Sequence, residues 1–140
     1  MAKEIPAGYE PIDFDIPFFQ LIGPVYHKVG AEVLHLGMLI EKQHCNSLAT
    51  VHGGLLATLA DVAAVRALVQ HLGDDKRAFT ISLHLDYIGT AYEGDWLEAH
   101  VQIKKGQGSV GFATCEIKEG ERLIMMASGS FKFITPRATD

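Results

Sequence analysis

Apolar residues dominate the middle of the chain, where the stretch from Gly53 to Val65 holds a single ionisable side chain, Asp61. A helix that is apolar on nearly every face is buried, so this stretch predicts a core helix that continues to about Leu72. The uncharged run is interrupted by Asp61 and ended by Arg66, so it falls short of the roughly 20 apolar residues that a membrane span needs. We therefore expect no membrane contact.

A regular alternation of apolar and polar residues follows this helix. From Phe79 to Tyr87 the apolar residues occupy every second position, which is the period expected of a half-buried strand. Three further segments, residues 95–105, 109–118 and 122–134, continue the pattern and are separated by glycine-containing turns. Consecutive strands after one apolar helix predict an α+β fold in which an antiparallel sheet curls around that helix.

Two shorter elements precede the helix. Residues 15–23 combine a capping Asp15, an early proline, apolar residues at helical spacing and a closing Gly23, which predicts a short helix. Residues 33–42 predict a strand. We expect one domain over residues 1–140, with residues 1–22 as an N-terminal extension that carries the short helix and residues 135–140 as a tail.

Composition narrows the class of protein. With 140 residues and 48% hydrophobic content, the chain is long enough to build one sizeable core. The net charge of -5 disfavours nucleic acid as a partner, because phosphate contacts need a basic face. The sequence shows no charged-then-apolar leader, so we expect a cytoplasmic protein in which Cys45 and Cys115 are free thiols.

The strongest sign of chemistry lies at the start of the predicted core helix, where Asn46 and His52 precede Gly53 and Gly54, and Asp61 follows. A carboxylate in an apolar helix must be paired, hydrogen-bonded or protonated, because a dry charge costs several kcal/mol or more. The N–H groups of a first helical turn have no partner within the helix, and glycine lets another group approach them. Singly, the aspartate and the glycines have structural explanations, but together they favour a site that polarises a carbonyl group.

The spacing of two of these residues bears on assembly. His52 and Asp61 are nine residues apart, which puts them half a turn out of phase and about 13.5 Å apart along a helix axis. One site in one chain does not easily use both side chains. If both serve one reaction, Asp61 acts in the site of a neighbouring subunit, so the sequence predicts a two-fold dimer.

Two other kinds of site are disfavoured. His44 and Cys45 are neighbours in extended chain and point to opposite sides, so Cys45 does not easily use His44 as a base. None of the histidines has the spacing of a zinc motif, so we expect no metal site.

In this order the residues resemble the hotdog-fold acyl-CoA thioesterase superfamily, and in particular its phenylacetate-pathway-like branch. The resemblance is carried by Asn46, His52-Gly53-Gly54 and Asp61, by Gly94-Asp95 before a strand and by the Lys104-Lys105-Gly106 turn. It covers about residues 23–134. It implies a hotdog fold, in which an antiparallel sheet wraps one long central helix, and an acyl-CoA substrate with no separate cofactor. It also implies a homodimer that assembles as a dimer of dimers.

The resemblance assigns roles to the motif residues. Gly53 matches the glycine whose N–H meets the thioester carbonyl, and Asp61 matches the base or nucleophile that the partner subunit supplies. Asn46 and His52 match positions that orient substrate or water, and Thr80 matches a hydroxyl-bearing position on the following strand. We further assign to substrate or CoA binding Gly54, Ser82, Tyr87, Lys104, Lys105, Gly106 and Ser109.

Some positions depart from the pattern or leave alternatives open. Ala49 stands where many relatives have glycine, and residues 88–91 lack a proline that often follows the preceding strand. Strict alternation points Thr80 away from the apolar face of its strand, so it would have to act across the subunit interface. The acyl pocket would be lined by the helix and the Phe18-Phe19 segment and would accept aryl or medium-to-long alkyl groups.

A binding protein is the alternative to an enzyme. A hotdog sensor or carrier of acyl-CoA would use the same motif except Asp61, which pure binding gives no reason to bury. The aspartate therefore favours hydrolysis over the sensor, and over a hydratase on the same fold.

Overall fold

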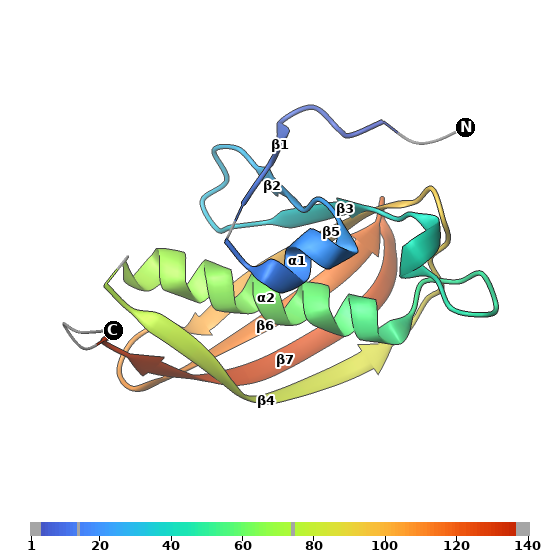
Figure 1. The fold of residues 1–140 in the computed structure, drawn as a ribbon. Helices are drawn as coiled ribbons and strands as arrows, with labels where there is room; N and C mark the ends of the chain where they lie inside the picture. Colours follow the sequence, from blue (N-terminus) through green and yellow to red (C-terminus); the bar gives the residue numbers. More distant parts are fainter. Residues whose placement is uncertain (1–3, 14, 74, 137–140) are drawn as a thin grey trace.

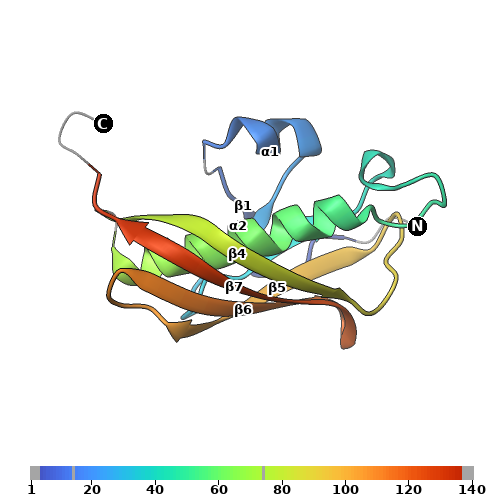
Figure 2. The same cartoon turned by 90° about the horizontal axis from the view of Figure 1, so that it is seen from below.

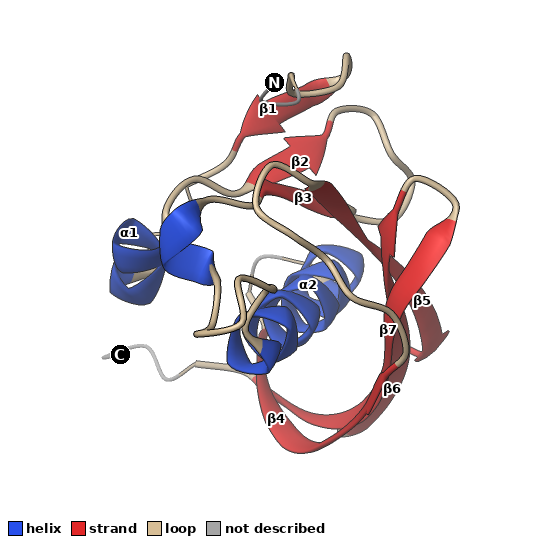
Figure 3. Cartoon of the chain, turned by 90° about the vertical axis from the view of Figure 1, so that its right-hand side faces the viewer, coloured by secondary structure: helices blue, strands red, loops and turns tan. Residues whose placement is uncertain are grey.

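The computed structural model describes residues 4–13, 15–73 and 75–136. An antiparallel sheet of seven strands, ordered β1-β2-β3-β5-β6-β7-β4, curls around one long helix, α2 (Figures 1, 2 and 3). The elements in chain order are β1 Tyr9–Pro11, α1 Pro17–Ile22, β2 Tyr26–Lys28, β3 Leu36–Leu39, the 3-10 turn Lys42–His44, α2 Gly53–Leu72, β4 Arg77–Tyr87, β5 Trp96–Lys105, β6 Val110–Glu119 and β7 Arg122–Ile134. The predicted α+β fold, with its antiparallel sheet around a central helix, is confirmed.

One face of α2 forms the centre of the core. Its small and branched side chains fit the inner face of the sheet, and the buried members are Leu56, Leu59, Ala60, Ala63, Ala64, Ala67 and Leu68. The helix is not buried all round, because Val62, Val65 and Val69 on its other side are half-buried. With 20 residues, α2 is long and apolar enough to cross a membrane by composition, but the sheet wraps it as the core helix of a domain.

The long strand β4 breaks the alternation expected of it. Its ladder with β7 shifts between Thr80 and Ser82, which marks a β-bulge at Ile81. A bulge inserts one residue and reverses which positions face inward. Leu83, after the bulge, is therefore half-buried as expected, whereas Phe79 before the bulge and Ile81 at the bulge are 54% and 57% exposed. The prediction that these last two side chains face the core is wrong.

The N-terminal third also differs from expectation. The short helix is confirmed at Pro17–Ile22 and ends at Gly23 with a φ of 99°, but Asp15 does not cap it, since the N-cap is Ile16 and makes no side-chain bond. The strand expected over residues 33–42 is confined to Leu36–Leu39. The sequence missed β1 and β2, which are too short to show an alternation. Of the expected tail, residues 137–140 lie outside the described residues.

A polar cluster joins β1 to the sheet. Glu98 accepts hydrogen bonds from the Trp96 indole at 2.9 Å and His100 Nε2 at 3.1 Å, and the Tyr9 ring packs edge-on against Trp96. Burial alone would raise the pKa of Glu98, but its bonds from Trp96 and Tyr9 and the charge and hydrogen bond of His100 outweigh that effect and lower it below 4.5. Burial and the nearby His100 lower the pKa of His35 below 6.5.

Candidate active site

The start of α2 leaves one backbone donor exposed to a ligand. The Gly54 N–H donates to His52 Nδ1 at 2.8 Å, and the N–H groups of Leu55 and Leu56 donate to the His52 carbonyl. Among the described residues no acceptor for the Gly53 N–H is recorded. The cap also fixes the tautomer of His52, because a neutral imidazole that accepts at Nδ1 carries its proton on Nε2, here on an exposed ring.

Steric contacts explain why residues 53 and 54 are both glycine. A Cβ at Gly53 would lie 3.2 to 3.3 Å from the Tyr87 ring, whose hydroxyl donates to the Gly53 carbonyl at 2.8 Å. A Cβ at Gly54 would lie 3.0 Å from His52 Nδ1. The pair therefore lets Tyr87 and His52 hold the first turn from two sides, and the Gly54 N–H is used by the protein itself.

Asn46 organises the loop that leads to this turn. Its side-chain oxygen accepts from the N–H groups of Leu48 at 2.9 Å and Thr50 at 3.2 Å, and its amide donates to the Thr50 hydroxyl at 2.9 Å. The loop includes Ala49 with a φ of 61°, a left-handed conformation that glycine adopts at lower cost. This explains why glycine suits the position where the sequence departs from the family pattern. The Asn46 side chain is thus engaged within the loop.

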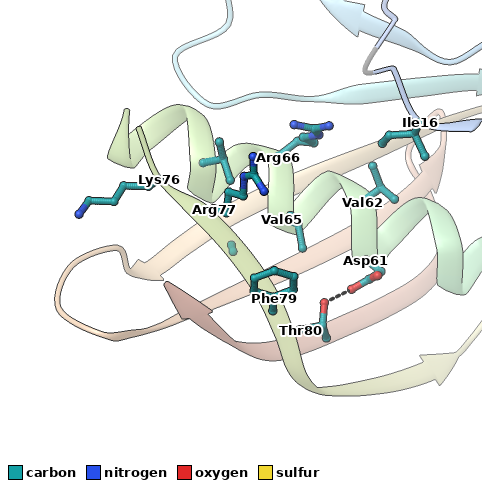
Figure 4. Close-up of a pocket in the computed structure, with 11 residues that line it drawn as sticks. Ile16, Asp61, Val62, Val65, Arg66, Lys76, Arg77, Phe79 and Thr80 are labelled. Carbon is teal, nitrogen blue, oxygen red and sulfur yellow. Dashed lines mark hydrogen bonds between the residues drawn. The ribbon is translucent and has the colours of Figure 1, made fainter. Parts of the chain in front are cut away.

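Asp61 forms a second part of the site with Thr80. The Thr80 hydroxyl donates to Asp61 Oδ1 at 2.6 Å, and no hydrogen bond to Oδ2 is recorded among the described residues (Figure 4). Because the bulge at Ile81 reverses the alternation, Thr80 faces α2 within its own chain. Thr80 therefore binds Asp61 of its own chain, and any role that it has across a subunit interface is exercised together with Asp61. Asp61 itself is half-buried, at the rim of a groove rather than sealed in the core.

The groove beside Asp61 runs between α2 and β4 and encloses a cavity of about 480 Å³. Its walls are mainly apolar, and most of the lining side chains come from α2 and β4, with one residue before α1 and one before β4 (Figure 4). The lining residues are Ile16, Asp61, Val62, Val65, Arg66, Val69, Lys76, Arg77, Ala78, Phe79 and Thr80. Neither Phe18 nor Phe19 is among them. The sequence missed Arg66 and Arg77, because Arg66 only marked the end of an apolar run and Arg77 precedes the alternating segment that begins at Phe79.

The remaining predicted residues lie elsewhere. Ser82 bonds Ser130 at 2.7 Å and lines a separate cavity that also contains Lys104, which donates to Gln102 at 2.9 Å. The turn with Lys105, Gly106 and Ser109 lies at the far end of α2, where a Cβ at Gly106 would approach His71 to 2.6 Å. Gly53 and His71 are about 27 Å apart along the helix axis. One chain therefore does not bring these residues to Gly53.

Cysteine and metal chemistry find no support in this region. His44 Nδ1 accepts from the Glu41 N–H, and its Nε2 contacts the Ile22 carbonyl, so the ring does not serve Cys45. Burial raises the pKa of the Cys115 thiol to about 12, which keeps it protonated and unreactive. Within residues 4–13, 15–73 and 75–136, no group of three or more His, Cys, Asp or Glu side chains is arranged to hold a metal ion.

Comparison with known proteins identifies similar chains. A family profile described as the thioesterase superfamily matches residues 48–125. A candidate esterase of Pseudomonas aeruginosa is 38% identical over 128 residues, which are 91% of this chain and 96% of that protein. Mouse acyl-coenzyme A thioesterase 13 is 28% identical over 120 residues, or 83% of this chain and 84% of that protein.

Solved structures of other proteins share this fold. The structure of the PaaI protein from the phenylacetic acid degradation operon of E. coli superposes with a TM-score of 0.76 at 20% identity and covers 86% of each chain. At this identity the likeness concerns the fold. Together with the profile match, it confirms the expected hotdog architecture and the resemblance to the thioesterase superfamily.

Proposed function

The chain belongs to the thioesterase superfamily and is a hydrolase of thioester bonds, and from this premise we propose that it hydrolyses acyl-CoA to a free acid and CoA. The similarity to mouse acyl-coenzyme A thioesterase 13 supports CoA as the thiol part of the substrate. We propose that the enzyme needs no separate cofactor and works in the cytoplasm.

The single observation that carries the mechanism is the N–H of Gly53, which has no recorded acceptor in the part of the chain that the structure describes. Every other N–H of the first turn of α2 is bonded to His52. A fixed donor at a helix start stabilises negative charge on a carbonyl oxygen during acyl transfer. The Gly53 N–H accordingly binds the thioester carbonyl, while the exposed Nε2–H of His52 offers a second donor nearby. Asn46 contributes by holding the loop that positions His52.

Asp61 supplies the other half of the reaction. Thr80 binds Oδ1, which leaves Oδ2 to take a proton from a water molecule that attacks the carbonyl carbon, or to attack that carbon itself. The tetrahedral oxyanion is held by the Gly53 N–H and collapses by breaking the C–S bond. When water attacks, the CoA thiolate leaves and takes up the proton that Asp61 removed. When Asp61 attacks, the thiolate leaves a mixed anhydride on Asp61, which a water molecule then hydrolyses to the free acid while its proton goes to the thiolate. Either route consumes one water for each acid and each thiol produced.

The proposed active enzyme is a two-fold dimer. Gly53 and Asp61 are about 12 Å apart along α2, too far for one carbonyl group in one chain. The strand that carries Thr80, β4, is the edge of the sheet and exposes Phe79 and Ile81, and a long apolar edge invites pairing with another strand. Antiparallel pairing of β4 with its copy runs the two α2 helices in opposite directions, so that the start of one helix faces Asp61 of the other.

The proposed positions of the CoA-binding residues depend on the same dimer. Lys104, Lys105, Gly106 and Ser109 lie beyond the end of α2, so we propose that they meet the phosphates of CoA at the surface of the dimer, or of a dimer of dimers. Tyr87 helps to position Gly53, because its hydroxyl donates a hydrogen bond to the Gly53 carbonyl.

The test is steady-state release of CoA from a panel of aryl and straight-chain acyl-CoA esters by wild type and by Asp61→Asn. The proposal predicts turnover by wild type and a loss of at least about a hundredfold in the variant, with acyl-CoA binding retained. Tight binding with no turnover by wild type on any ester would instead identify an acyl-CoA sensor or carrier.

A further inference from the structure

The lining of the groove beside Asp61 changes from apolar to cationic along its length. Next to Asp61 its walls are apolar, with Val62 and Val65 from α2 and Ala78 from β4. Toward the end of the helix the lining includes the cations Arg66 and Arg77. A chain that fills this groove meets a carboxylate at one end, methyl groups in the middle and guanidinium groups at the other end.

Arg66 and Arg77 both line this groove. In Figure 4 the Arg77 side chain rises from β4 toward Arg66 on α2, whereas the Lys76 ammonium points away from both, toward a bond of 2.7 Å with Thr135. Arg77 is exposed, and no carboxylate of the described residues lies within ion-pair distance of it. Two cations on one groove attract an anion, and arginine binds a carboxylate through two parallel hydrogen bonds.

The spacing fits a ligand of moderate length. Arg66 follows Asp61 by five residues, about 7.5 Å along the helix axis. Arg77 precedes Thr80 by three residues, about 10 Å along the strand. With carbon–carbon bonds of about 1.5 Å, an extended acyl chain of about six to eight carbons bridges the reacting centre and the guanidinium groups.

We infer that this groove takes an acyl group that ends in a carboxylate, so that the substrate is the CoA thioester of a medium-chain dicarboxylic acid. The inference rests on the proposed acyl-CoA hydrolysis. The pantetheine arm of CoA suits the groove less well, because it carries two amide groups whose burial without hydrogen bonds is costly. Val62, Val65 and Ala78 offer those amides no polar side chain, but they suit the methylene groups of an acyl chain.

The experiment compares esters that differ only at the far end of the acyl group. kcat/KM is measured for octanedioyl-CoA (the mono-CoA ester) and octanoyl-CoA with wild type, Arg77→Met and Arg66→Met. Lys132→Met is the matched control, since Lys132 is an exposed cation on the neighbouring strand, in register with Phe79 and outside the groove. The ratio of the two esters cancels any effect on binding of the shared CoA.

The inference predicts that wild type prefers the dicarboxylic ester and that Arg77→Met lowers the ratio about tenfold, while Lys132→Met leaves it unchanged. A ratio that Arg77→Met and Arg66→Met both leave unchanged overturns the inference and leaves the thioesterase intact. An equal loss on both esters also overturns it, because it assigns the arginines to the CoA phosphates.

A second readout does not depend on turnover. Titration calorimetry of the free acids on the whole protein predicts tighter binding of octanedioate than of octanoate, with the difference removed by Arg77→Met. If no ester is hydrolysed but this difference is found, the proposed function fails and the anion-binding groove stands. Equal or weaker binding of octanedioate overturns the inference whatever the catalytic result.

Discussion

The backbone N–H of Gly53 can be removed without rebuilding the site. Gly53 is the first residue of α2, a position at which helices accept proline because its missing N–H has no partner within the helix. His52 has φ -64° and ψ 133°, which is the extended conformation that a residue before proline prefers. Gly53→Pro therefore deletes the proposed carbonyl donor while the helix start and its His52 cap remain.

The expected loss is that of one oxyanion donor, about 100- to 1000-fold in kcat, or about 2.7 to 4 kcal/mol of transition-state stabilisation. Proline also adds a Cβ, which would lie 3.2 to 3.3 Å from the Tyr87 ring and push it back by a few tenths of an ångström. Gly53→Ala adds the same atom and keeps the N–H, so the comparison between the two variants isolates the donor.

The assay is CoA release under saturating ester, with circular dichroism and thermal unfolding to check that both variants fold. We expect Gly53→Ala to retain most of its kcat and Gly53→Pro to lose at least a hundredfold relative to it. Equal activities of the two folded variants would refute the role of the Gly53 N–H, and equal losses would assign the effect to the displaced Tyr87.

Three further predictions concern other parts of the molecule. Thr80→Val removes the bond to Asp61 Oδ1 and should lower kcat about ten- to a hundredfold, whereas Thr80→Ser should retain it, as measured by CoA release. Ala49→Gly relieves a left-handed residue and should raise the free energy of unfolding by about 1 kcal/mol in a urea titration; no gain would contradict the strain. Folding lowers the pKa values of His35 and Glu98, so as the pH falls both groups take up protons in the unfolded chain before they do in the folded chain. The free energy of unfolding therefore has its full value above pH 6.5 and decreases as the pH drops below 6.5 and again below 4.5. Thermal unfolding against pH should show both steps, the first lost in His35→Asn and the second in Glu98→Gln.

The parts of the fold that the sequence predicted are those with strong periodicity. The apolar run from Gly53 and the alternation over β5, β6 and β7 dictate a central helix and a sheet, because burial of those faces outweighs local preferences. The boundaries of β3 and the existence of β1 and β2 were not predicted, because strands of three or four residues are too short to show an alternation of apolar and polar positions.

The candidate site was predicted as a set of residues but not as a geometry. The proposed role of Gly53 could be predicted, because the sequence implies an unpaired backbone donor at any helix start. The inward orientation of Thr80 could not be predicted, because it depends on a bulge at Ile81 that reverses the alternation. No residue at that place indicates a bulge in the sequence.

The central claim is that each active site combines Gly53 of one subunit with Asp61 of its partner, and mixed dimers test it most directly. Gly53→Pro and Asp61→Asn chains, each nearly inactive alone, are co-expressed with different tags or unfolded and refolded together. Half of the randomly assembled dimers then hold one intact site out of two, so the account predicts about a quarter of the wild-type activity. Activity no greater than the sum of the two parent variants, in a sample shown to contain mixed dimers, would contradict it.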